Sequence, residues 1–119
     1  MVLTQDDNGL FVTVGEVNGT RVKFLIDTGA SDIVLAPEDA RRAGIDPDTL
    51  TYNRMSEIAN GVGNGASATV DTLAVGPIRF NHVNVTVNQA PMGSSLLGMP
   101  FLRRLKSFEV NGRKLTLRY

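Results

Sequence analysis

One acidic residue stands directly at the end of an apolar, strand-like run. Residues 22–26 lead into Asp27-Thr28-Gly29, and the glycine permits a tight turn immediately after the acid. A carboxylate at the end of an apolar strand costs free energy of folding unless it is hydrogen-bonded, and it is otherwise retained for chemistry. The pattern therefore predicts either a turn stabilised by the aspartate side chain or a candidate catalytic carboxylate.

Short apolar runs separated by turn residues recur along the whole chain. The runs at 10–14 and 22–26 flank Asn18-Gly19, and those at 108–110 and 115–117 flank Asn111-Gly112. An Asn-Gly pair between two such runs is a strong hairpin signal. The first strand is expected to begin at Leu10. Further strands are expected at 33–35, 51–60, 66–75, 78–80, 83–87 and 96–97, with 78–80 pairing with 83–87 and the glycines at 61–65 forming the turn of a long hairpin.

Two short helices interrupt this pattern. They are expected at 37–43 and 99–105, because each segment carries a proline in its first turn and basic residues toward its end. Many short strands with two brief helices predict an all-β, barrel-like fold. At 119 residues the chain is expected to form one domain.

Composition excludes several classes of function. Twelve basic residues balance twelve acidic ones, so no charge excess favours nucleic acid or an anionic membrane surface, and Arg41-Arg42 and Arg103-Arg104 are expected on solvated helix faces. The chain has no cysteine, and its single histidine, His82, is expected half-exposed. A two-histidine zinc motif, a thiolate site and a Ser-His-Asp arrangement are therefore excluded. We expect neither a metal nor a cofactor.

The sequence has no apolar run near the roughly 20 residues that span a bilayer and no signal peptide. Because the first strand is expected so close to Met1, we expect an excised domain of a longer protein.

A second glycine turn completes a pattern that resembles a known family. Leu96-Leu97-Gly98 runs into the helix expected at 99–105. With the string at 25–31 and the glycine-rich hairpin between them, it resembles the active-site elements of retropepsin-like aspartic proteases, the single-domain family that includes the retroviral proteases. The resemblance covers residues 10–105. It implies that residues 1–119 form a closed retropepsin-like (acid protease) barrel with a flap hairpin, one half of a homodimeric protease.

The family's chemistry needs two aspartates, and this chain supplies one Asp-Thr-Gly. Hydrolysis of an amide requires a general base for water and a general acid for the carbonyl oxygen, and two carboxylates about 3 Å apart provide both by sharing one proton. The resemblance therefore implies an aspartic endopeptidase whose dyad is Asp27 from each of two subunits. Thr28 would bond across the two-fold axis, and Gly29 would let the substrate backbone approach.

The resemblance also implies residues that bind an extended polypeptide substrate. Asp32 would hold substrate backbone, although a solvated loop acid has the same sequence signature. The hairpin near residue 60 would close over the peptide as a flap, although it is equally a glycine-rich turn with no task. Residues 92–95 would form a pocket wall. The expected substrate-binding residues are Ala30, Ser31, Asp32, Ile58, Ala59, Asn60, Gly61 and Leu96.

The chain departs from the retroviral pattern after Gly98. Retroviral enzymes continue with an arginine that pairs with an acid near the active site, whereas this chain has Met99-Pro100, so that ion pair is either absent or rebuilt. This departure and the longer helix at 37–43 resemble the bacterial members of the family. They imply a soluble domain of an inner-membrane-anchored protein that faces the periplasm.

Two other functions compete with this assignment. A catalytically silent retropepsin-like module for dimerisation or peptide binding would keep the same sequence features. Phosphoryl transfer through an aspartyl phosphate is excluded, because Gly29 stands where a second acid is needed and no glycine-rich phosphate loop is present.

Overall fold

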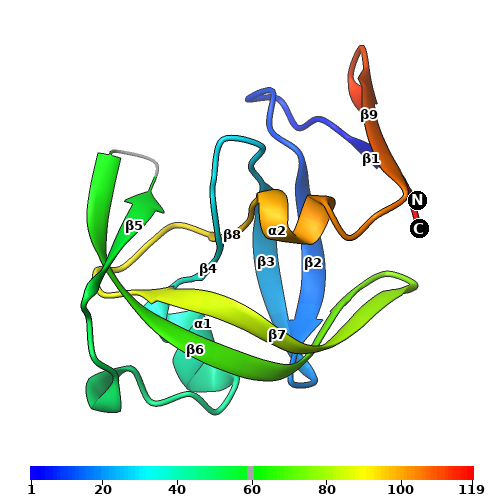
Figure 1. The fold of residues 1–119 in the computed structure, drawn as a ribbon. Coiled ribbons are helices and arrows are strands. Elements are labelled where there is room, and N and C mark those ends of the chain that lie inside the picture. Colours follow the sequence, from blue (N-terminus) through cyan, green and yellow to red (C-terminus); the bar gives the residue numbers. More distant parts are fainter. Residues whose placement is uncertain (59–60) are drawn as a thin grey trace.

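The computed structural model describes residues 1–58 and 61–119. These residues form mainly β-strands, with two short α-helices and one 3-10 turn (Figure 1). The strands are β1 (Val2–Thr4), β2 (Val12–Val17), β3 (Thr20–Ile26), β4 (Ile33–Leu35), β5 (Arg54–Ile58), β6 (Gly61–Val75), β7 (Ile78–Asn88), β8 (Ser95–Leu97), β9 (Ser107–Asn111) and β10 (Lys114–Arg118). The helices are α1 (Pro37–Arg42) and α2 (Met99–Leu102), and the 3-10 turn is η1 (Pro47–Thr49).

Six strands close into a barrel. Their order is β2-β3-β8-β4-β7-β6, and a pairing of β2 with β6 closes the ring. The pairs Glu16↔Ala74 and Val17↔Leu73 make this closure. β5 pairs with β6 outside the ring, and the β5–β6 hairpin extends away from the barrel (Figure 1). The predicted all-β, closed barrel with two short helices is confirmed.

Large apolar side chains fill the interior. Phe24, Leu35, Leu97 and Phe101 are at most 1% exposed, and they belong to one continuous cluster that draws on strands from all sides of the ring. Each such side chain contributes roughly 1.5–3 kcal/mol by its burial. The core therefore fixes β3, β4 and β8 side by side, which positions the ends of these three strands.

Both chain ends lie in a second, three-stranded sheet of order β1-β10-β9. The amino group of Met1 donates to the carbonyl oxygen of Leu117 over 3.0 Å, and Leu117 N donates back to Met1 O over 2.8 Å. The expectation that the first strand begins at Leu10 is wrong. Residues 2–4 form a strand because β10, more than a hundred residues later, supplies their hydrogen-bonding partners.

Both predicted Asn-Gly hairpins are present. Asn18 and Gly19 have φ angles of 51° and 80°, the positive values that a type I′ turn needs, and they connect β2 to β3. The turn between β9 and β10 lies one residue later than expected. Asn111 pairs with Lys114, so Gly112 and Arg113 form the loop, with positive φ at Gly112.

Three sequence-based expectations about the longer strands and α2 are wrong. Residues 78–88 form one strand rather than a pair, because β6 partners them over their length and the turn falls at Gly76-Pro77. The glycines at 61–65 lie within β6, paired with β5. The second helix ends at Leu102 and not at residue 105.

His82 lies within β7 at an exposed position and has a φ of 52°. Within the residues that the structure describes, no helix is long and apolar enough to cross a membrane.

Candidate functional site

Asp27 follows the last residue of β3 and is half-buried. Its Oδ1 accepts a hydrogen bond of 2.9 Å from Gly29 N, and Ala30 N donates to its carbonyl oxygen over 3.2 Å. Thr28 and Gly29 are both exposed. The sequence Asp-Thr-Gly thus forms a tight turn whose backbone orients one carboxylate oxygen and presents the next two residues to the surface.

The Gly98 turn lies against the Asp27 turn, as the resemblance to the active-site elements of the family implies. β8 runs parallel to β3 and antiparallel to β4 between them, with Leu97 paired with both Ile26 and Ile33. Asp27 N donates to Leu97 O over 3.0 Å, and Met99 N donates to Ala30 O over 3.0 Å. These two backbone bonds tie the turns together on either side.

Gly98 is required at this contact. A Cβ atom there would collide with the backbone oxygens of Asp32 and Ala30, the latter 2.6 Å away. Real Cβ atoms do not come this close to backbone oxygens, so any larger residue would push the two turns apart. The close approach of the strand ends therefore explains why glycine follows Leu97.

Ala30 and Leu96 form an apolar floor behind the turns. They are 1% and 4% exposed and pack with Val34, and the partly buried Leu25 and Met92 cover the group. Met92 thus packs beside Leu96, and its role in a pocket wall stays a prediction.

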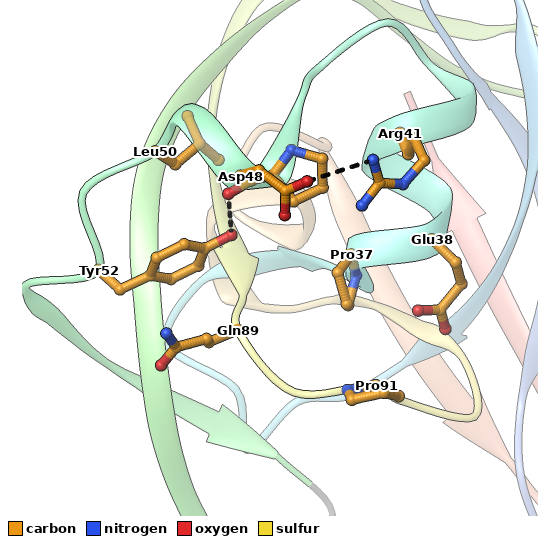
Figure 2. A pocket seen from close by; sticks show the side chains of 9 residues that line it. Pro37, Glu38, Arg41, Asp48, Leu50, Tyr52, Gln89 and Pro91 are labelled. Carbon is orange, nitrogen blue, oxygen red and sulfur yellow. Dashed lines mark hydrogen bonds and ion pairs between the residues drawn. The ribbon is translucent and has the colours of Figure 1, made fainter.

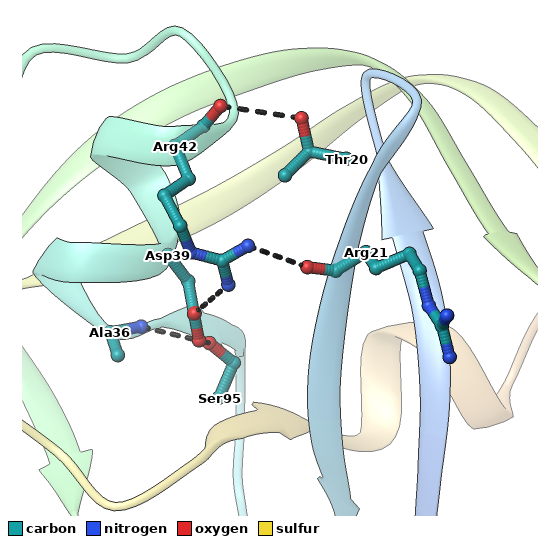
Figure 3. Close-up of polar contacts among 6 residues, drawn as sticks. All are labelled: Thr20, Arg21, Ala36, Asp39, Arg42 and Ser95. Atoms are coloured by element: carbon teal, nitrogen blue, oxygen red, sulfur yellow. Dashed lines mark hydrogen bonds and ion pairs between the residues drawn. The ribbon is translucent and has the colours of Figure 1, made fainter.

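Ser95 does not contribute to that wall. It is the first residue of β8 and is fully buried. Its hydroxyl donates to Asp39 Oδ2 over 2.7 Å and accepts from Ala36 N over 2.9 Å (Figure 3). Arg42 bonds the other oxygen of Asp39 and donates to Arg21 O over 2.9 Å. This network links α1, β8 and the β2–β3 hairpin, and it fixes β8 next to the floor.

Asp32 has a partner that sequence reasoning missed. Its Oδ1 lies 3.7 Å from Arg54 Nη2 on β5, and both residues line a cavity of about 210 Å³ together with Asn84, Thr86 and Pro100. No local pattern connects two residues 22 positions apart, so only the fold reveals the pair. Ser31 is exposed beside Asp32.

The expected flap corresponds to the β5–β6 hairpin. Ile58 pairs with Gly61 at its last described rung. Ala59 and Asn60 lie outside the described residues. Met55, on the same strand as Ile58, is 76% exposed. A hairpin is present, with the glycines at 61–65 in its second strand rather than in its turn, and its role as a flap stays a prediction.

A larger cavity of about 540 Å³ lies apart from these residues, between α1, η1 and the loop after β7 (Figure 2). The Tyr52 hydroxyl donates a hydrogen bond to Pro47 O over 2.7 Å. Arg41 Nη1 lies 3.7 Å from Asp48 Oδ2. Burial raises the pKa of the Tyr52 phenol, and the charges of Asp48 and Asp46 raise it further against the opposing effect of Arg41. Among the described residues, none of those expected in the site lines this cavity.

Within residues 1–58 and 61–119, no group of three or more His, Asp or Glu residues could hold a metal ion. The chemistry available at the two turns is therefore that of one carboxylate on an exposed, backbone-ordered turn above an apolar floor.

Comparisons with known proteins agree with this geometry. The model of the family described as gag-polyprotein putative aspartyl protease matches residues 13–104. A crystal structure of a retropepsin-like aspartic protease from Rickettsia conorii is 34% identical and superimposes with a TM-score of 0.86, covering 100% of this chain and 88% of that one.

Two bacterial relatives are similar over nearly the whole chain. An uncharacterized protein, RP867, from Rickettsia prowazekii is 34% identical over 119 residues, which are 100% of this chain and 51% of the relative. An uncharacterized protein from Sinorhizobium, described by its place in the cobV 5′ region, is 36% identical over 99% of this chain and 51% of its own length. The chain thus spans about half the length of these relatives.

Proposed function

This chain belongs to the gag-polyprotein putative aspartyl protease family, and from that premise we propose that it is an aspartic endopeptidase that acts as a homodimer. Asp27 from each of two subunits forms the catalytic dyad. The retropepsin-like fold is that of the Rickettsia conorii protease. The observation that supports the proposal most is the pair of backbone bonds, Asp27 N to Leu97 O and Met99 N to Ala30 O, that joins the two turns.

The proposed reaction needs no group beyond two carboxylates and water. Two carboxylates about 3 Å apart hold one proton between them. The ionised one accepts a proton from water as the water attacks the scissile carbonyl carbon, and the protonated one donates to the carbonyl oxygen. The tetrahedral intermediate then collapses with protonation of the leaving amine. Gly29 N donates a hydrogen bond to Asp27 Oδ1 and would hold the carboxylate in place during every step of the reaction.

The proposed dimer follows from the single Asp-Thr-Gly of the sequence. Because Thr28 and Gly29 are exposed, the same turn is available to a second copy around a two-fold axis. Thr28 would bond across that axis, and Gly29 would face the substrate backbone.

The proposed substrate is an extended polypeptide. The β5–β6 hairpin would close over it, using the residues expected for the flap, and would add backbone hydrogen bonds as an extra strand does. Asp32 and Ser31 would contact the peptide on the barrel side, above the floor of Ala30 and Leu96. Because the relatives are about twice as long as this chain, attachment to an inner membrane stays a prediction that rests on the family resemblance.

The test is substitution of the proposed catalytic carboxylate. Asp27→Asn keeps the shape of the turn but removes the shareable proton, so cleavage of a denatured protein such as casein should fall by several orders of magnitude. A matched Asp6→Asn variant, in the loop after β1, should keep full activity. If wild type and Asp27→Asn are both folded, dimeric and equally inactive over a broad peptide panel, the silent binding module is the better assignment.

A further inference from the structure

The neutral net charge of the chain conceals a separation of charge along the sequence. Between Asp71 and Glu109 there is no acidic residue, but there are four basic ones. These are Arg79, Arg103, Arg104 and Lys106. A basic segment within a neutral chain marks a local positive potential, for which the overall composition gives no indication.

The fold gathers three of these residues around one cavity. Arg79 lies on β7, Arg104 follows α2 and Lys106 precedes β9, and all three line a cavity of about 370 Å³. In the described part of the chain, no acidic side chain lines this cavity and none of the three cations forms an ion pair. Three unneutralised cations at one cavity repel each other, so an anion there would relieve the repulsion.

Arg104 is held in place without being neutralised. Its Cζ lies 5.1 Å from the centre of the Phe80 ring, and Phe80 packs edge-to-face on the buried Phe101 with ring centres 5.9 Å apart. The ring face attracts the guanidinium but leaves its N–H groups free of a carboxylate. Arg104 is exposed, as expected, but it follows the helix rather than lying on its face, because α2 ends at Leu102.

We propose that this cavity binds a soluble, phosphate-bearing small molecule. A phosphate group carries a charge of about −1.5 to −2 and three acceptor oxygens, which matches two guanidiniums and an ammonium better than a single carboxylate does. One guanidinium group can donate two parallel hydrogen bonds to the oxygens of a phosphate group. Tyr119, which also lines the cavity and is 54% exposed, offers an aromatic surface to the organic part. The proposal does not depend on peptidase activity.

Binding is tested by calorimetric titration of the intact protein with pyrophosphate and with inorganic phosphate. We expect saturable binding at one site, stronger for pyrophosphate and weakened by added sodium chloride. Arg79→Gln and Arg104→Gln should each lower the affinity about tenfold or more, and Arg104→Lys should retain part of it. Matched controls outside the cavity, Arg21→Gln and Lys114→Gln, should leave it unchanged.

Thermal unfolding of each variant separates lost binding from lost folding, and Lys106→Gln tests the cavity without touching the Phe80 contact. Absence of binding at millimolar pyrophosphate, or equal weakening in the cavity and control variants, would overturn the proposal.

A parallel sedimentation with vesicles distinguishes the source of the phosphate. Binding to vesicles that contain phosphatidic acid, with none to pyrophosphate, would assign the cavity to a lipid headgroup and contradict a soluble ligand.

Discussion

Asp32 Oδ1 and Arg54 Nη2 lie 3.7 Å apart and connect the loop after the Asp27 turn to the first strand of the β5–β6 hairpin. Their side chains are 27% and 46% exposed, so solvent screens this pair only in part. The sequence left open whether an ion pair near the candidate site is lost or rebuilt, since Met99 replaces the arginine of retroviral enzymes. Arg54 gives Asp32 a partner within the chain.

The ion pair is tested by a double-mutant cycle on the free energy of unfolding with Asp32→Asn, Arg54→Gln and both together. We expect a coupling of about 0.5 kcal/mol that shrinks with salt. The Glu109–Arg118 pair, with both side chains more than half exposed, is the matched control and should couple more weakly. A coupling energy of zero within error would show that Asp32 and Arg54 act independently.

Gly98 is predicted to tolerate no side chain. Gly98→Ala forces a methyl group against the backbone of Ala30 and Asp32, so it should lower the free energy of unfolding by about 1–3 kcal/mol and also disturb the Asp27 turn. Gly93→Ala is the matched control, because nothing lies within 4 Å of a Cβ atom there, and it should change stability by less than about 0.5 kcal/mol. Urea unfolding measures the free energy of unfolding of both variants. Equal losses in Gly98→Ala and Gly93→Ala would contradict the prediction that Gly98 tolerates no side chain.

The Ser95 hydroxyl is predicted to stabilise the barrel through its two buried hydrogen bonds. Ser95→Ala leaves Asp39 Oδ2 and Ala36 N without this partner, which should cost about 1–3 kcal/mol. Ser67→Ala, at an exposed position of β6, should be nearly neutral. Thermal and urea unfolding of the two variants supply the comparison, and a neutral Ser95→Ala would show that the network contributes no net stability.

Tyr52 is predicted to make stability depend on pH in the alkaline range. Its pKa is raised in the folded state, chiefly by burial, so the native protein holds the phenolic proton more tightly than the unfolded chain. The resulting stability is fully present below the unfolded pKa near 10 and is lost as pH rises through the folded pKa. Urea unfolding from pH 7 to 11 should show a steeper alkaline loss for wild type than for Tyr52→Phe. Parallel curves would contradict the burial of the phenol.

The sequence identified the features that depend on neighbouring residues or on the order of motifs. Asn18-Gly19 predicted its hairpin because two adjacent residues must adopt positive φ, and few residues other than Asn and Gly do so. The proximity of Asp27 and Gly98 was implied by the family resemblance, which the order of the two motifs supported. Both are confirmed in the structure.

Features that depend on distant partners were missed. Strand β1 forms because β10 pairs with it. Residues 81 and 82 continue β7 because β6 pairs with Asn81 and with Val83, on either side of His82. The Asp39–Ser95 contact joins residues 56 positions apart. A spacing of this kind carries no periodic signal, so local patterns could not have revealed these contacts.

The central claim is that two copies of Asp27 form one active site, and a mixing experiment tests it most directly. A fixed amount of wild type is mixed with increasing amounts of Asp27→Asn, at a total concentration where activity per chain no longer rises, and cleavage is measured after subunit exchange. The account predicts that the variant captures wild-type chains in inactive heterodimers, so activity falls to about half at equal amounts and toward zero at large excess. Serum albumin added in place of the variant should have no effect. Wild-type activity that stays constant at every excess of Asp27→Asn would contradict the shared dyad.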